Sequence, residues 1–208
     1  MKGCLSSIFK LIIAILVFFG LVHLGVIDFV KEKIQEKQDT KQERMIDKTK
    51  DVIDLSEINE EYTINKNLKL LKNRMITAEH KATGQKFIMI EPKNENILTK
   101  DDIKNDDLQK KLEEAVAKYK YQLVKFNKIE VTKRGEMKAL DQKIPYANIT
   151  VEISNLPIKD ANGIVGVAEL EDGKNMIIIS VNEKGKYSQI ITDGFYNKVK
   201  QCKNDTKD

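Results

Sequence analysis

The chain has 208 residues, of which 33% are charged and 41% are hydrophobic, and its formal net charge is +4. This apolar fraction allows a packed core, and the interleaved charges lack the concentrated basic face of a nucleic-acid-binding protein. Its two cysteines, Cys4 and Cys202, lie near opposite ends and form no CxxC pair, so the sequence offers no zinc-binding or redox motif.

The first predicted element is an apolar segment at residues 11–30, which follows a short N-terminal tail of residues 1–10. Its length matches the roughly 20 apolar residues that a membrane-spanning helix requires. Secretory signal peptides have a shorter apolar core and end at a small-x-small cleavage site, which Gly20 and Gly25 do not form. We therefore expect an uncleaved, single-pass signal-anchor in the cell membrane, with a cleaved signal peptide as the alternative.

The orientation of this segment is not decided by charge, because lysines flank it almost equally on both sides. The flank before it is very short, which favours an N-terminus inside the cell. The rest of the chain would then lie outside the cytoplasm, in a bacterium in the periplasm or at the cell exterior. The alternative is a scaffold that faces the cytoplasm.

Residues 31–54 contain neither Pro nor Gly and are rich in Lys, Glu and Gln, which are good helix formers. Their apolar residues are too sparse for the heptads of a coiled coil. We expect a charged, partly helical and solvated stalk. It would carry a globular domain over residues 55–202, followed by a polar tail at 203–208.

The first half of the domain predicts a covering segment, a hairpin and a helix. Residues 55–67 suit a short helix or a covering segment. The apolar runs 68–80 and 87–92 are separated by Thr83-Gly84, a pair typical of a β-hairpin turn. A helix follows that Asp106 or Asp107 can cap; its apolar stripe consists of Leu108, Leu112, Ala115, Val116 and Tyr119.

The second half predicts four strands and a final helix. The strands are "YQLVKFNKIEVTK", followed by a turn at "RGEM", then "IPYANITVEI", "GIVGVAEL" and "NMIIISV". The last of these is apolar on both faces, as a central, doubly covered strand would be. Residues 187–202 predict the closing helix, with Cys202 as a small core residue.

The predicted order is thus two strands, a helix, four strands and a helix. It indicates an α+β domain with a mainly antiparallel sheet covered by two helices. The order over residues 68–202 resembles the PsbP-like α/β/α sandwich proteins, with a strand ending in proline ("FIMIEP") and a last helix after "GKY". The tryptophan common after that proline is replaced by Lys93 and Asn94. Many such proteins are anchored or lipidated extracytoplasmic factors that assist assemblies, and the resemblance implies a similar role.

Few residues offer a chemistry. His80 is the only histidine outside the apolar segment, and its place in "TAEHKATG" predicts an exposed side chain on a turn. The acidic segment 101–107 gathers four carboxylates but lacks the glycine and closing glutamate of an EF-hand loop. Tyrosines at 62, 121, 146 and 196 suit either a groove or the core. We expect no catalytic residue, no metal and no cofactor.

The sequence as a whole predicts a membrane-anchored, extracytoplasmic binding or assembly-factor domain without evident catalysis. Its expected partners are the lipid bilayer, through residues 11–30, and another envelope protein, with no nucleic acid. The alternative is a membrane-anchored hydrolase that uses His80 or the acidic segment 101–107.

Overall fold

The computed structural model describes residues 38–58, 60–70, 73–92, 98–118, 125–154 and 160–202. The predicted anchor, the first part of the predicted stalk and the C-terminal tail lie outside these residues. In the part that the structure describes, no helix is both long enough and apolar enough to span a membrane.

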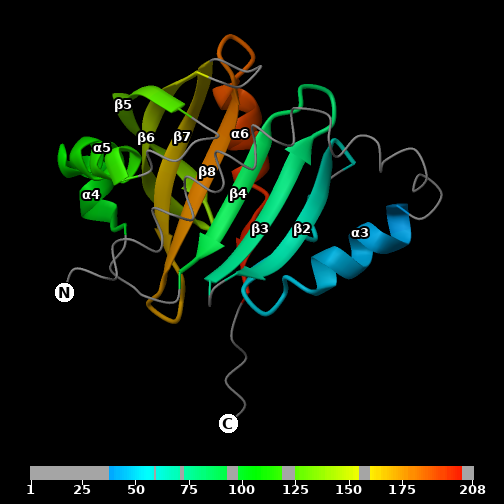
Figure 1. The fold of residues 1–208 in the computed structure, drawn as a ribbon. Coiled ribbons are helices and arrows are strands. Elements are labelled where there is room, and N and C mark those ends of the chain that lie inside the picture. The colour runs from blue at the N-terminus through cyan, green and yellow to red at the C-terminus, as the bar shows by residue number, and fades with distance from the viewer. Residues whose placement is uncertain are drawn as a thin grey trace.

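A seven-stranded antiparallel sheet forms the centre of the domain, in the order β2-β3-β4-β8-β7-β6-β5 (Figure 1). This confirms the predicted α+β class with a mainly antiparallel sheet. A separate antiparallel pair joins the two ends of the domain and consists of β1 (Ile53–Asp54) and β9 (Lys200–Gln201). The seven strands are β2 (Tyr62–Leu70), β3 (Asn73–His80), β4 (Lys86–Glu91), β5 (Lys125–Ala139), β6 (Gln142–Ser154), β7 (Asp160–Glu169) and β8 (Asn175–Glu183).

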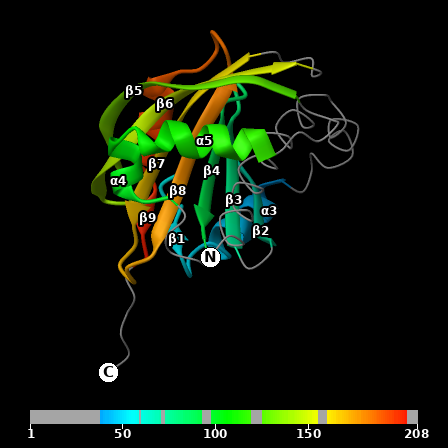
Figure 2. The same cartoon turned by 60° about the vertical axis from the view of Figure 1, so that its left-hand side comes forward.

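Short helices pack on both faces of this sheet. On one face lie α4 (Lys100–Lys104) and α5 (Asp107–Lys118), and α5 runs across the strands (Figure 2). The opposite face carries α6 (Gln189–Tyr196), whose Phe195 and Tyr196 enter the second half of the core. A fourth helix, α3 (Gln38–Asp47), lies beside the outer strand β2 (Figure 1).

Strand β8 is central, as its apolar sequence predicts, because both of its faces are covered. Ile177 and Ile179 pack on the α5 side, and Met176 and Ile178 on the α6 side. All four side chains are at most 4% exposed. The two halves of the core therefore meet across this strand, which holds the layers together by burial on both sides.

Three local predictions were wrong. Strand β2 takes up residues 62–67 of the segment expected to be a covering element, and it forms a hairpin with β3. The "RGEM" stretch continues β5 instead of turning; the turn comes at Leu140 and Asp141, whose φ angles are 53° and 58°. The closing helix ends at Tyr196, and β9 follows it. In addition, the sequence did not predict the short helix α4.

The predicted stalk also differs from expectation where it is described. Met45, Ile46 and Val52 are partly buried and pack against the core on the α6 side of the sheet. Thr49 is fully buried, and its hydroxyl donates to the Ile46 carbonyl at 2.7 Å. Arg74 of β3 bonds the Lys48 carbonyl and so holds this stretch to the sheet. The residues from Met45 onward therefore belong to the folded domain and are not a solvated linker.

Candidate functional site

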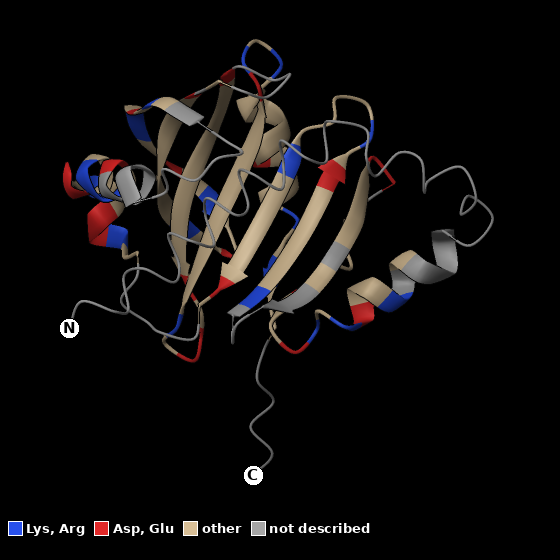
Figure 3. Cartoon of the chain, viewed as in Figure 1, with Lys and Arg blue, Asp and Glu red and all other residues tan. Residues whose placement is uncertain are grey.

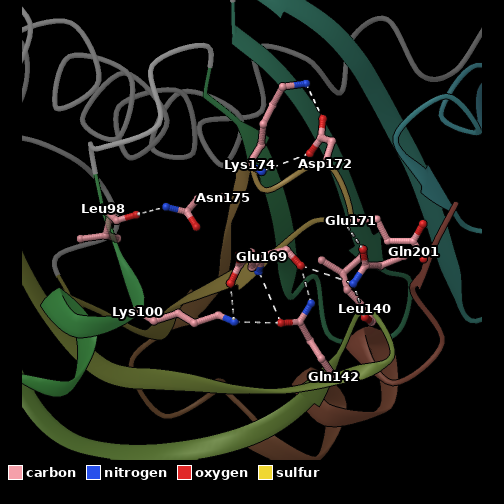
Figure 4. Close-up of polar contacts among 10 residues, drawn as sticks. All are labelled: Leu98, Lys100, Leu140, Gln142, Glu169, Glu171, Asp172, Lys174, Asn175 and Gln201. Carbon is pink, nitrogen blue, oxygen red and sulfur yellow. Dashed lines mark hydrogen bonds and ion pairs between the residues drawn. The ribbon is translucent and has the colours of Figure 1, made fainter. Parts of the chain in front are cut away.

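In strands β3, β4, β7 and β8 the charged residues lie near the strand ends and the middles are uncharged, whereas β5 carries charges along its length (Figure 3). A set of polar contacts lies where β7 ends and β8 begins (Figure 4). We call it the strand-end cluster, and define it as Lys100, Gln142, Glu169, Asp172, Lys174 and Gln201. It draws on α4, β6, β7, β9 and the turn between β7 and β8, so it is assembled only by the complete fold.

Two glutamines of this cluster bond backbone carbonyls of neighbouring segments. The Gln142 amide donates to the Glu169 carbonyl at 2.6 Å, and its oxygen accepts from Lys100 Nζ at 3.2 Å. The Gln201 amide donates to the carbonyls of Leu140 and Glu169, at 3.1 and 3.3 Å. These bonds tie β9 and the two neighbouring hairpin ends into one surface.

The lysines of this region are neutralised by carboxylates. Lys174 Nζ lies 2.5 Å from Asp172 Oδ2 and 3.3 Å from Glu91 Oε1. The hydrogen bond from Lys174 to Asp172 raises the pKa of Lys174, against the opposing effect of burial. For Asp172, burial acts to raise the pKa, but the hydrogen bonds from Lys174 outweigh it and lower that pKa. Both groups are therefore held in their charged forms at neutral pH.

Lys200 shows the same pattern beside the cluster. Its Nζ lies 3.2 Å from Asp141 Oδ1, and this hydrogen bond raises the pKa of Lys200. A lysine that acts as a nucleophile or general base needs a lowered pKa, so that the neutral amine is populated. Lys174 and Lys200 are shifted in the opposite direction. The cluster suits recognition through fixed charges better than covalent or acid–base catalysis.

His80 lies at the end of β3, where the strand runs into the turn, and it is half-buried, whereas its sequence predicts an exposed side chain. Its Nδ1 is 2.9 Å from Thr83 Oγ1, and its ring lies against Tyr62 with the centroids 5.2 Å apart. The partners that the hydrolase alternative needs, a serine or a carboxylate beside the imidazole, are not among these contacts. The contacts of His80 are those of a residue that shapes the β3–β4 turn.

The acidic segment 101–107 is divided between α4 and the start of α5. Thr99 caps α4, and its hydroxyl and N–H exchange hydrogen bonds with Asp102 in a capping box. Lys111 Nζ lies 2.5 Å from Asp102, and Asp106 pairs with Arg134 at 3.0 Å. Burial alone would raise the pKa of Asp102, but the bonds from Lys111 and Thr99 lower it.

These acids do not form a metal centre in the described part of the chain. No group of three or more His, Cys, Asp or Glu side chains there is placed to hold a metal ion. Two of the four carboxylates are used in a helix cap and an ion pair instead. The segment therefore acts in the fold, as the capping interpretation of its sequence suggests, although the cap residue is Thr99 and belongs to α4.

The candidate tyrosines that the structure describes serve the core. Tyr196 is fully buried, and its hydroxyl lies 2.7 Å from the Ile179 carbonyl and 3.2 Å from that of Ile88. Tyr62 is 3% exposed and packs edge-on against Phe87. Tyr121 lies outside the described residues. Tyr146 is partly buried and covers Gly135 of the neighbouring strand.

Sequence reasoning missed a buried polar network that fastens α6 to the sheet. Gln85 is fully buried; its amide nitrogen lies 2.8 Å from Thr192 Oγ1 and 3.0 Å from Ser180 Oγ, and its oxygen accepts from the Ser188 N–H at 2.8 Å. Burial raises the pKa of the adjoining Tyr187 to about 12, so its phenol stays protonated. Nothing in "TGQKF" signals these partners, which lie about 100 residues away.

The chain matches no protein-family model, and a search of curated proteins found no match. These comparisons assign the chain to no family, and what the structure itself shows is an α+β domain with a seven-stranded antiparallel sheet and few helices.

Proposed function

We propose that the protein is a single-pass membrane protein whose α+β domain binds another envelope protein outside the cytoplasm, in the manner of an assembly factor. The observation that carries this proposal is the strand-end cluster. Its lysines are paired with carboxylates, the hydrogen bond to Asp172 raises the pKa of Lys174, its glutamines bond backbone carbonyls, and exposed carboxylates lie at its rim. A rigid, charged surface whose groups are not activated for catalysis suits recognition of a protein partner.

The exposed rim consists of Asp141, Glu169, Glu171 and Asp172. All of them except Glu171 form an ion pair with a lysine of this region, so Glu171 offers its charge most directly to a partner. Carboxylates of this kind steer and select a partner whose own surface carries basic residues. The PsbP-like element order supports the same role, since many proteins of that type assist assemblies. The hydrolase alternative has less support, because His80 and Asp102 are engaged in a turn and a helix cap.

The packing of the predicted stalk supports a short tether between this domain and the bilayer. Residue 38 begins the described helix α3, and the predicted anchor ends at residue 30. Eight residue steps span at most about 28 Å when fully extended. A domain tethered in this way reaches partners in or beside the same membrane.

The test begins with the full-length chain in native membranes. Vesicles are floated through a density gradient after a carbonate wash, and the protein should float with them. Crosslinking in intact membranes followed by purification should then capture a defined partner. A protein that washes off, or that captures no partner and instead turns over a substrate, would contradict the proposal.

Charge-reversal variants locate the binding surface. Glu171→Lys reverses one exposed rim carboxylate, and we expect the crosslinked product to fall several-fold. Glu60→Lys is the matched control, because Glu60 is equally exposed but lies before β2, at the opposite end of the sheet. Equal yields from both variants would show that the strand-end cluster is not the binding surface.

A further inference from the structure

Strand β5 is the last strand of the described sheet. On the side away from β6, a side chain of α5 bonds the β5 backbone at a place where another strand could pair. Gln109 of α5 donates from its amide nitrogen to the Ile129 carbonyl at 3.0 Å. Its amide oxygen accepts from the Val131 N–H at 2.7 Å. β5 pairs with β6 on its other side, and these two groups point away from that partner.

The pattern of the two bonds is that of a strand neighbour. In a parallel ladder, one residue donates to the carbonyl of residue i and accepts from the N–H of residue i+2 on the adjacent strand. The primary amide of Gln109 meets Ile129 and Val131 in the same way. A single side chain thus takes the place of one residue of a neighbouring strand that the described part of the chain does not supply at this edge.

Further along β5, the side chain of Arg134 holds the covering helices beside the strand. Its guanidinium donates to the carbonyls of Ile103 and Asn105, at 3.1 and 2.9 Å, and holds the α4–α5 junction beside β5. Register shifts on both sides of the Ile129–Val131 stretch interrupt the ladder with β6. Bulges and covering helices are the devices by which proteins keep an outer strand from pairing with other chains.

We propose that Gln109 closes the edge of β5 against addition of a strand from a second copy of this chain. An uncovered edge exposes a row of unpaired N–H and C=O groups, which template pairing with another strand. A second copy presents an identical 15-residue β5, so two such edges can meet about a two-fold axis. The proposal goes beyond the proposed function and does not depend on the membrane anchor.

The test uses the full-length chain in one mild detergent and replaces Gln109 by Ala. We expect wild type to keep one mass by sedimentation velocity at every concentration, while Gln109→Ala shifts toward twice that mass as concentration rises. Lys110→Ala is the matched control, because Lys110 is exposed on the same helix and one residue away. It should behave as wild type.

Hydrogen exchange identifies the surface that associates. In Gln109→Ala the Val131 amide should exchange several-fold faster than in wild type at low concentration, and it should regain protection when the variant associates. A folded Gln109→Ala variant that keeps the wild-type mass at every concentration would overturn the proposal, whatever its exchange rates. So would a wild-type protein that already associates through this edge.

A second variant covers the case in which Gln109→Ala does not fold. Gln109→Met keeps the length of the side chain without adding a charge, but its thioether cannot donate to the Ile129 carbonyl and is only a weak acceptor for the Val131 N–H. We expect this variant to associate as Gln109→Ala does. A folded Gln109→Met variant that stays monomeric across the concentration range would also overturn the proposal.

Discussion

The buried guanidinium of Arg74 helps to attach the turn after α3 to the sheet, together with the Asn67 amide, which donates to the Lys48 carbonyl at 2.9 Å. The Arg74 side chain is only 8% exposed, and it bonds the Lys48 carbonyl and the Asn67 side-chain oxygen, the latter at 3.1 Å. It also forms an ion pair with Asp51 at 2.5 Å. Arg74→Ala removes all three interactions and leaves space beside the core.

The expected loss of stability follows from these partners. A hydrogen bond from a charged donor contributes about 1.5–3 kcal/mol, toward the lower end when water can replace the donor, as it can at the exposed Lys48. The Asp51 carboxylate is 64% exposed, so its ion pair contributes less than about 1 kcal/mol. We expect Arg74→Ala to lower the free energy of unfolding by about 2–3 kcal/mol.

Urea unfolding of the full-length chain, followed by circular dichroism, measures this change. Asp51→Asn separates the ion pair from the other bonds and should cost less than about 1 kcal/mol. Trypsin should also cleave the Arg44–Lys50 stretch faster in Arg74→Ala than in wild type. An equal destabilisation in both variants, or one below about 0.5 kcal/mol in Arg74→Ala, would refute the attachment by backbone and amide bonds.

Three further changes test other parts of the fold by urea unfolding. Tyr196→Phe removes a buried hydroxyl bonded to the Ile179 carbonyl and should cost about 1–2 kcal/mol, without a change in circular dichroism. Gly163→Ala should cost at least about 2 kcal/mol, because the new Cβ would lie 2.2 Å from the Ser180 carbonyl oxygen of the neighbouring strand. Folding lowers the pKa of Asp102, so its contribution is present above the unfolded value of about 3.9 and is lost as pH falls through the folded value. Wild type should therefore lose more stability than Asp102→Asn between about pH 5 and pH 2.

Elements with a strong local pattern were predictable from the sequence. The apolar run of β8, the alternation in β6 and the stripe of α5 each reflect the burial of one or two faces, which the residue types encode directly. The Thr83-Gly84 turn was predictable from its residue types as well, since Gly84 has a φ of +69°. These elements sufficed to predict an antiparallel α+β domain.

The errors arose where distant partners override local preference. Leu140 adopts a positive φ although leucine is a poor turn residue, because the long β5–β6 ladder brings the strands together at that point. Gly135 looked like a turn residue, but it makes room for the Tyr146 ring on the opposite strand. The strand propensity of β2 is masked by its Lys and Asn residues, which suit an outer strand.

The candidate site was least predictable of all. Gln142 and Gln201 act by bonding the backbone of other strands, and a glutamine that does this has the same sequence signature as one on the surface. His80 and the segment 101–107 drew attention because their residue types are common in active sites. Residue type alone cannot distinguish a catalytic carboxylate from the capping carboxylate of Asp102.

The described edges of the sheet lead to one conclusion about recognition. Gln109 occupies the edge of β5, while Gln42 of α3 donates to the Tyr62 carbonyl at the edge of β2, at 3.3 Å. Helices on each face of the sheet cover its apolar side chains. A partner that approaches the described domain therefore meets strand ends before it meets free strand edges or faces. If the domain binds an envelope protein as we propose, this geometry favours the strand-end cluster as the binding surface, and Glu171→Lys is the most informative variant.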